Sequence, residues 1–219
     1  MGTSTSRPSP RGETWAAVRR GFGDPGLSVR RAVVQMAGAL DEGFISSLSG
    51  SPVAEALNGV LRRSREIGAA AGDMARLTSV ARELRESLAT GAALRKDASE
   101  AGELAREATT RTVLRATSPS SSSRAQLASA FLRTYVAALF GHLAARDLSR
   151  SLGRGRFMAF GQIAAFIQDV ERHVEERAGD VAAEDLEAAE DIEALGQVLD
   201  EQIRRALDDL KQDPSEDAG

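Results

Sequence analysis

Apolar side chains recur along most of this chain at intervals of three and four residues, which is the spacing of one face of an α-helix. Between residues 52 and 117 almost every position is compatible with a helix. A seam of apolar residues runs through this region: Leu77, Val80, Leu84, Leu88, Ala98, Ala101, Ala105 and Ala108. The spacing predicts helices that pack along this seam, as in a bundle or a coiled coil.

The best hydrophobic pattern follows a serine-rich segment at 118–123. A helix predicted over 124–152 has bulky residues on its inner face: Phe131, Leu132, Tyr135, Val136, Leu139, Phe140 and Leu143. A turn at Gly153–Gly155 leads to a second helix with its own stripe: Phe157, Phe160, Ile163, Phe166, Ile167 and Val170. We expect an antiparallel αα-hairpin that holds the best core of the molecule.

Start and stop signals divide the first half of the chain into further helices. One apolar stripe predicts a continuous helix over 28–48, and Gly50 suits the position just after its end. Ser51 then suits the N-cap of the next helix, with Pro52 as its first helical residue. A break is expected at Gly68–Gly72.

The last helix is predicted over 181–211, with Asp180 as its N-cap. Its apolar stripe comprises Ile192, Leu195, Leu199, Ile203, Ala206 and Leu210. This stripe keeps closer to a 3.6-residue than to a 3.5-residue repeat, because Leu199 is followed by Ile203. The repeat favours packing against a bundle over a long left-handed coiled coil.

These elements predict an all-α fold: an elongated helical bundle with a C-terminal aromatic-rich αα-hairpin and a final acidic amphipathic helix. The expected parts of the chain are a disordered N-terminal tail (1–13), an Ala-rich helical region (14–117), a Ser/Pro linker (118–123), the hairpin plus acidic helix (124–212) and a disordered acidic tail (213–219).

Composition agrees with a helical fold and narrows the chemistry. The favoured residues are strong helix formers, and the chain has no cysteine, which excludes disulfides, thiolate nucleophiles and Cys-ligated zinc. A strong preference for arginine over lysine is typical of a GC-rich bacterial genome. The N-terminus has no apolar signal segment, and the most apolar helix contains Arg133, so we expect a cytoplasmic protein that does not bind a membrane.

The sign of the charge reverses near residue 169. Residues 169–219 contain 18 acidic and 5 basic side chains, a net of −13, whereas the preceding residues contain 14 acidic and 23 basic ones, a net of +9. Such asymmetry predicts contact of the acidic helix with the chain itself or with a charged partner.

A cluster of arginines is the candidate binding site: Arg146, Arg150, Arg154 and Arg156, at the predicted turn of the hairpin. Guanidinium groups bind phosphates through paired hydrogen bonds, so this corner could bind nucleic acid or another polyanion. Three other interpretations remain open. The arginines could stabilise a helix C-terminus, could simply be solvated, or could bind the acidic last helix within the molecule.

A metal site is a further alternative. Asp169, His173 and Glu176 share one helical face at spacings that could hold a divalent metal for a metal-dependent enzyme. The ordinary interpretation is a solvated charged face, because Arg172 and Arg177 lie beside them.

The chain contains neither a phosphate-binding P-loop nor a G-x-S-x-G nucleophile motif, and no cofactor is expected. We therefore expect a non-catalytic interaction protein, such as a scaffold, adaptor or regulatory subunit. The alternative is a nucleic-acid or polyanion-associated protein, as a component of a bacterial defence or phage-related system. Its partner would be another helical protein or a second copy of the chain. The surfaces expected to associate are the seam of 74–110 and the stripe of the last helix.

Overall fold

The computed structural model of this chain describes residues 10, 12–48, 50–90, 100–116, 118, 123–148, 152–153, 157, 159–180, 185, 189 and 191–212. Within these residues the regular elements are α-helices, and no β-strand occurs among them. The predicted all-α class is therefore confirmed. The expected tails and most of the Ser/Pro linker lie outside the described residues.

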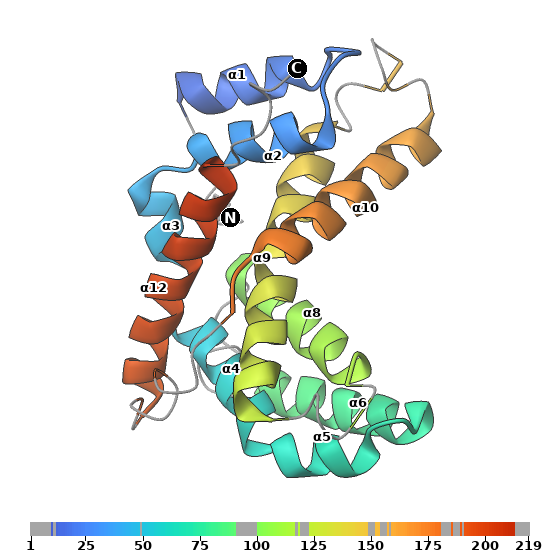
Figure 1. Cartoon of the computed structure of the whole chain (residues 1–219), viewed down its shortest axis with the longest axis vertical. Coiled ribbons are helices and arrows are strands. Elements are labelled where there is room, and N and C mark those ends of the chain that lie inside the picture. Colours follow the sequence, from blue (N-terminus) through green and yellow to red (C-terminus); the bar gives the residue numbers. More distant parts are fainter. Residues whose placement is uncertain are drawn as a thin grey trace, which may run out of the picture.

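Helix α9 (Arg124–Leu148) is the centre of the fold. It is buried over most of its surface, which explains why apolar residues are not confined to one face of its sequence. Figure 1 shows it running through the molecule, with α10 (Phe160–Arg177), α8 (Glu100–Leu114) and α4 (Ser51–Arg62) packed against it. By length and composition α9 could cross a membrane, but 83% of its most apolar stretch is buried inside the molecule.

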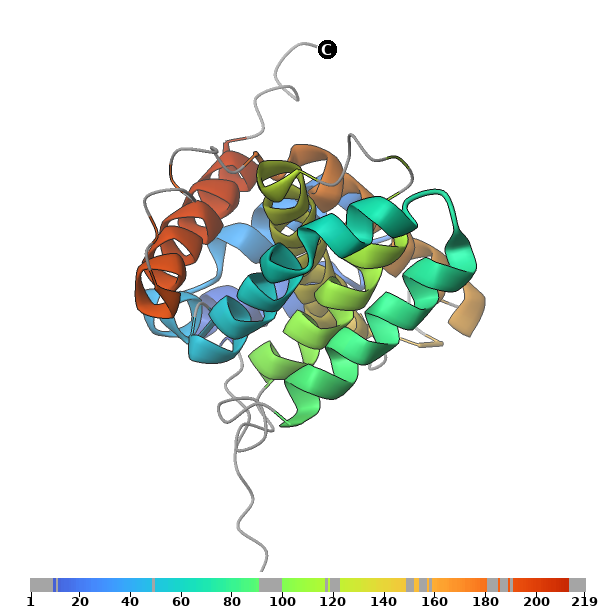
Figure 2. The same cartoon turned by 90° about the horizontal axis from the view of Figure 1, so that it is seen from below.

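The lower part of the molecule is a layer of helices below and beside α9. Helices α5 (Ser64–Ala70) and α6 (Met74–Thr90) follow α4, and α8 packs between α6 and α9 (Figure 2). The turn expected at Gly68–Gly72 is present, because α5 ends at Ala70 and Gly72 has a φ of 85°, which favours glycine.

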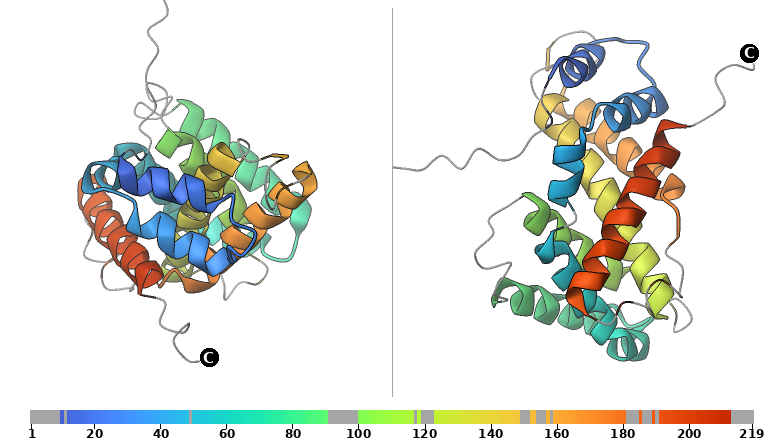
Figure 3. Two further views of the ribbon diagram at one scale, coloured as in Figure 1. Left: turned by 90° about the horizontal axis from the view of Figure 1, so that it is seen from above. Right: turned by 90° about the vertical axis from the view of Figure 1, so that its left-hand side faces the viewer.

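The upper part contains the first helices and the last one. Helices α1 (Glu13–Gly21) and α2 (Val29–Gly38) lie across the top, followed by α3 (Glu42–Leu48) (Figure 1). Helix α12 (Ile192–Lys211) runs along one side from α2 to α4 (right view of Figure 3). Core residues from before and after the serine-rich segment therefore belong to one hydrophobic cluster, from Trp15 to Leu210.

The continuous helix predicted over 28–48 is wrong. The structure divides it into α2 and α3, with a break at residues 39–41. Ser28 caps α2 by accepting a hydrogen bond from the Arg31 N–H, and the Asp41 carboxylate accepts one from the Phe44 N–H at 2.7 Å. A carboxylate that satisfies the first free N–H groups favours a new helix start over continuation of the old helix.

Two predicted helix starts are also corrected. The N-cap of α4 is Gly50, not Ser51, which is already helical. The described part of the last helix begins at Ile192, where Asp191 is the N-cap and accepts a hydrogen bond from the Ala194 N–H at 2.8 Å. Most of residues 181–190 lie outside the described residues.

The inward positions predicted for the two aromatic helices are confirmed with one exception. Phe131, Tyr135 and Phe140 are fully buried, and the Phe157 and Phe166 rings meet edge to face with centroids 5.5 Å apart. Phe160 is the exception, because its side chain is 70% exposed. It is the first residue of α10, and the N-terminal end of that helix extends past α9 in Figure 1.

Candidate functional site

The predicted arginine corner is only partly described, and its one described member is used inside the fold. The Arg146 guanidinium lies 3.0 Å from the buried Asp147 carboxylate and 5.7 Å from the centre of the Trp15 ring. The Trp15 indole N–H donates a hydrogen bond to the same carboxylate at 2.9 Å. Arg146 therefore attaches α1 to the end of α9. Arg150, Arg154 and Arg156 lie outside the described residues, so phosphate binding by them stays a prediction.

The three residues of the possible metal site do not form one in the structure. Asp169 is paired with Arg172 on the same helix, and Glu176 is exposed. Among the described residues, which include Asp169, His173 and Glu176, no group of three or more such side chains could hold a metal ion. The geometry fits the charged solvated face that the neighbouring arginines indicated.

Most of the apolar residues expected to contact a partner are buried inside the fold itself. In the seam, Leu77, Leu84 and Ala105 are buried where α6, α8 and α4 pack together. In the last helix, Leu199 and Ile203 are buried against the rest of the bundle. Apart from Ile192, the described members of both stripes are therefore buried in the fold, and association with a partner stays a prediction.

Ile192, at the start of the α12 stripe, nevertheless lines a groove of about 850 Å³ between the first turn of α4 and the first turns of α12. We call it the α4/α12 groove, and its lining residues are Ser51, Ala54, Ile192, Glu193, Gly196, Gln197, Asp200, Glu201 and Arg204. The apolar or small part of the lining, here called the floor, comprises Ala54, Gly196 and Ile192, whose side chain is 39% exposed.

The rim of the α4/α12 groove is acidic. Glu193, Asp200 and Glu201 line it together with one guanidinium, that of Arg204, which gives a net charge of −2. Most of the charges therefore have the sign that attracts a cationic partner.

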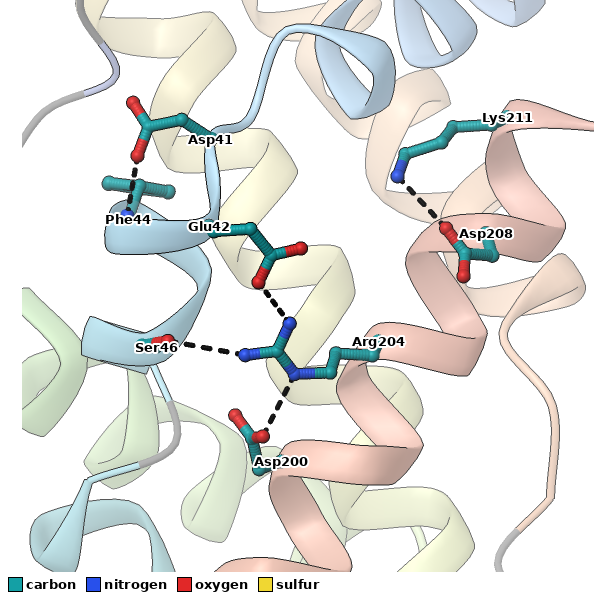
Figure 4. A network of polar contacts seen from close by, with 8 residues as sticks. All are labelled: Asp41, Glu42, Phe44, Ser46, Asp200, Arg204, Asp208 and Lys211. Atoms are coloured by element: carbon teal, nitrogen blue, oxygen red, sulfur yellow. Dashed lines mark hydrogen bonds and ion pairs between the residues drawn. The ribbon is translucent and has the colours of Figure 1, made fainter.

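The Arg204 guanidinium is hydrogen-bonded to other residues of the protein. Its guanidinium donates hydrogen bonds to Glu42, to Asp200 at 2.9 Å and to Ser46 at 3.2 Å (Figure 4). These two carboxylates raise the pKa of Arg204 above its usual value. The network joins α12 to α3 and fixes one end of the groove.

Sequence reasoning missed the groove because its two sides come from residues 51–54 and 192–204, far apart in the chain. The available signal was the excess of acidic residues after position 169 together with Ile192 at the end of an apolar stripe. Those features indicate an acidic amphipathic helix but not the element that it faces.

Comparison with known proteins does not assign the chain to a family or a function. No protein-family model, no curated protein and no solved structure matches this chain.

Proposed function

We propose that this protein is a non-catalytic helical interaction protein that binds a basic amphipathic helix of a partner protein in the α4/α12 groove. The single observation that carries the proposal is the groove itself, which combines an apolar floor with an acidic rim. Grooves of this type bind helices by burying apolar side chains, while charges at the rim select the partner.

The dimensions support a helical occupant. Ile192 and Arg204 are 12 residues apart on α12, which corresponds to about 18 Å along a helix at about 1.5 Å per residue. A partner helix of about three turns spans that length. Apolar side chains spaced three and four residues apart would face Ile192 and Gly196, and flanking lysines or arginines would face Glu193 and Glu201.

A synthetic peptide tests the proposal directly. The probe is a leucine/lysine helix of about 18 residues with its lysines on one face, and the comparison peptide has the same composition in scrambled order. Calorimetric titration should give saturable binding of the amphipathic peptide only. Affinity should fall as salt is raised, because exposed charges are screened beyond about 10 Å at 0.1 M.

Two matched pairs of variants locate the binding. Glu193→Gln with Glu201→Gln removes two groove carboxylates and should weaken peptide binding by about tenfold, since rim charges contribute modestly to affinity. Glu103→Gln with Glu176→Gln removes two exposed carboxylates from α8 and α10 and should leave affinity unchanged. Equal affinities for all three proteins, or equal binding of both peptides, would contradict the proposal.

Light scattering separates a foreign partner from a second copy of the chain. The proposal predicts a single chain of 23.2 kDa in the absence of peptide. A mass of two chains that returns to one chain in the Glu193/Glu201 variant would identify the occupant as a second copy.

A further inference from the structure

A second cavity, of about 450 Å³, lies where the end of α8 meets the first turns of α9. It is separate from the α4/α12 groove and shares no lining residue with it. Its walls are formed partly by apolar groups, including Ala116, Ala125 and Leu127, and partly by Thr112, Arg115 and Arg133. The volume is within the range of about 300–1,000 Å³ that is usual for small-molecule sites, which combine apolar walls with a few polar groups.

Two buried hydrogen-bond donors at this cavity have no partner among the described residues. They are the Thr112 hydroxyl, in a residue only 1% exposed, and the Arg133 Nε. Thr109 and Thr110 on the same helix donate to backbone carbonyls one turn earlier, at 2.9 and 3.0 Å. An unpaired buried donor costs about 1–3 kcal/mol, so such groups are usually satisfied in folded proteins.

Two arginines, Arg115 and Arg133, line the cavity together with one carboxylate, that of Asp180. Arg133 pairs with Asp180, which is 74% exposed, and Arg115 pairs with Glu175. Burial lowers the pKa of Arg115, and the neighbouring charge of Arg111 lowers it further.

The first turn of α9 lies at the same cavity. Ala125 and Gln126 belong to this turn and line the cavity, and Ser123 accepts a hydrogen bond from the Gln126 N–H at 3.3 Å. The N–H groups at the start of a long helix point out of it and carry partial positive charge.

We propose that this cavity binds a small organic anion, whose carboxylate or phosphate accepts hydrogen bonds from Arg133, Arg115 and Thr112. A compact apolar body then packs on Ala116, Ala125 and Leu127. Planar guanidinium groups bind both kinds of oxyanion through paired hydrogen bonds. Asp180 competes for the same guanidinium, and its exposed side chain can turn into solvent when the ligand binds.

Three probes test the chemistry with the full chain: benzoate, phenyl phosphate and the uncharged benzamide, at matched ionic strength. At least one of the two anions should bind saturably with a Kd of about 1 mM or tighter, and benzamide should not. The comparison of the two anions identifies the preferred oxyanion. Amide NMR shifts should be largest around Ala125 and Gln126.

Substitutions give effects of opposite sign. Thr112→Val should weaken anion binding by about tenfold, because it replaces the hydroxyl donor by a methyl group of similar volume. The same change should leave the free protein equally or more stable, since the hydroxyl there is unpaired. Asp180→Asn should tighten binding by about two- to fivefold, because it removes a competing charge.

Arg133→Met should weaken binding by at least about tenfold, whereas Arg205→Met on α12, which also removes an exposed ion-paired arginine, should have no effect. No saturable binding of either anion up to about 10 mM would overturn the proposal. Equal binding of benzamide, or unchanged affinity in Thr112→Val, would overturn it as well. Neither result bears on the α4/α12 groove, which is tested with a different probe and different variants.

Discussion

Replacing Asp147 by alanine should loosen helix α1 from the end of α9. Asp147 is 4% exposed and accepts a hydrogen bond from the Trp15 indole at 2.9 Å and one from Arg146 at 3.0 Å. Alanine removes both acceptors at once. The indole N–H is then buried with no carboxylate to accept it, and the half-buried guanidinium loses its nearest negative charge.

The expected cost follows from these two losses. An unpaired buried N–H costs about 1–3 kcal/mol, and breaking a buried ion pair costs about 3–5 kcal/mol when both charges are inside. The Arg146 side chain is 26% exposed, so water compensates part of its loss. We expect a destabilisation of about 2–4 kcal/mol for Asp147→Ala. Asp147→Asn, which keeps an acceptor for Trp15, should cost about half of that.

Urea denaturation followed by fluorescence measures both the size and the place of the effect. Trp15 is the only tryptophan of the chain and is 1% exposed, so its emission reports directly on the docking of α1. In Asp147→Ala the emission should shift to the red at lower urea than the loss of helical circular dichroism. In the parent protein the two transitions should coincide.

The control is Asp208→Ala, which removes an exposed carboxylate paired with Lys211 at 2.9 Å and should cost less than about 1 kcal/mol. If Asp147→Ala were no more costly than this control, or left the Trp15 emission unchanged, the buried contact would not hold α1.

Three further substitutions have defined outcomes. Tyr135→Phe removes a buried hydroxyl that donates to the Leu48 carbonyl at 2.7 Å, and calorimetry should show a loss of about 1–2 kcal/mol. Gly141→Ala should destabilise the protein by about 1–3 kcal/mol in urea denaturation despite its better helix propensity, because the new Cβ would collide with the Glu171 side chain. Phe160→Ser should leave the Tm unchanged within error, because that ring is 70% exposed; a marked loss would mean that the ring is buried in solution.

Much of the fold could be predicted from local pattern. The apolar stripes of α9 and α12 occupy the buried positions expected of them except at Ile192, and the break before Met74 follows from Gly72 and the capping Asp73. Local pattern failed at Asp41, where a cap competes with an apolar stripe that continues through it. It failed again at Phe160, because periodicity assigns a face of a helix without showing where the neighbouring helix ends.

The candidate sites were less predictable than the helices. Arg146 belonged to a visible cluster of like charges, but its partner Trp15 is 131 residues away in the chain. Thr112 gave no signal at all, because a threonine hydroxyl usually finds a carbonyl on its own helix. Only the packing of α8 against α9 places that residue at a cavity that Arg115 and Arg133 also line.

The sequence by itself determined that this chain forms helices and which residues of most helices are apolar and buried. Those properties depend on residues within a few positions of each other, so they are written in the local order of side chains. The tertiary structure decided which surfaces remain open: it buried the described seam residues, such as Leu77, Leu84 and Ala105, and kept the acidic rim of α12 beside α4. Such outcomes depend on contacts such as that of Arg204 with Glu42, 162 residues apart, which no local pattern specifies.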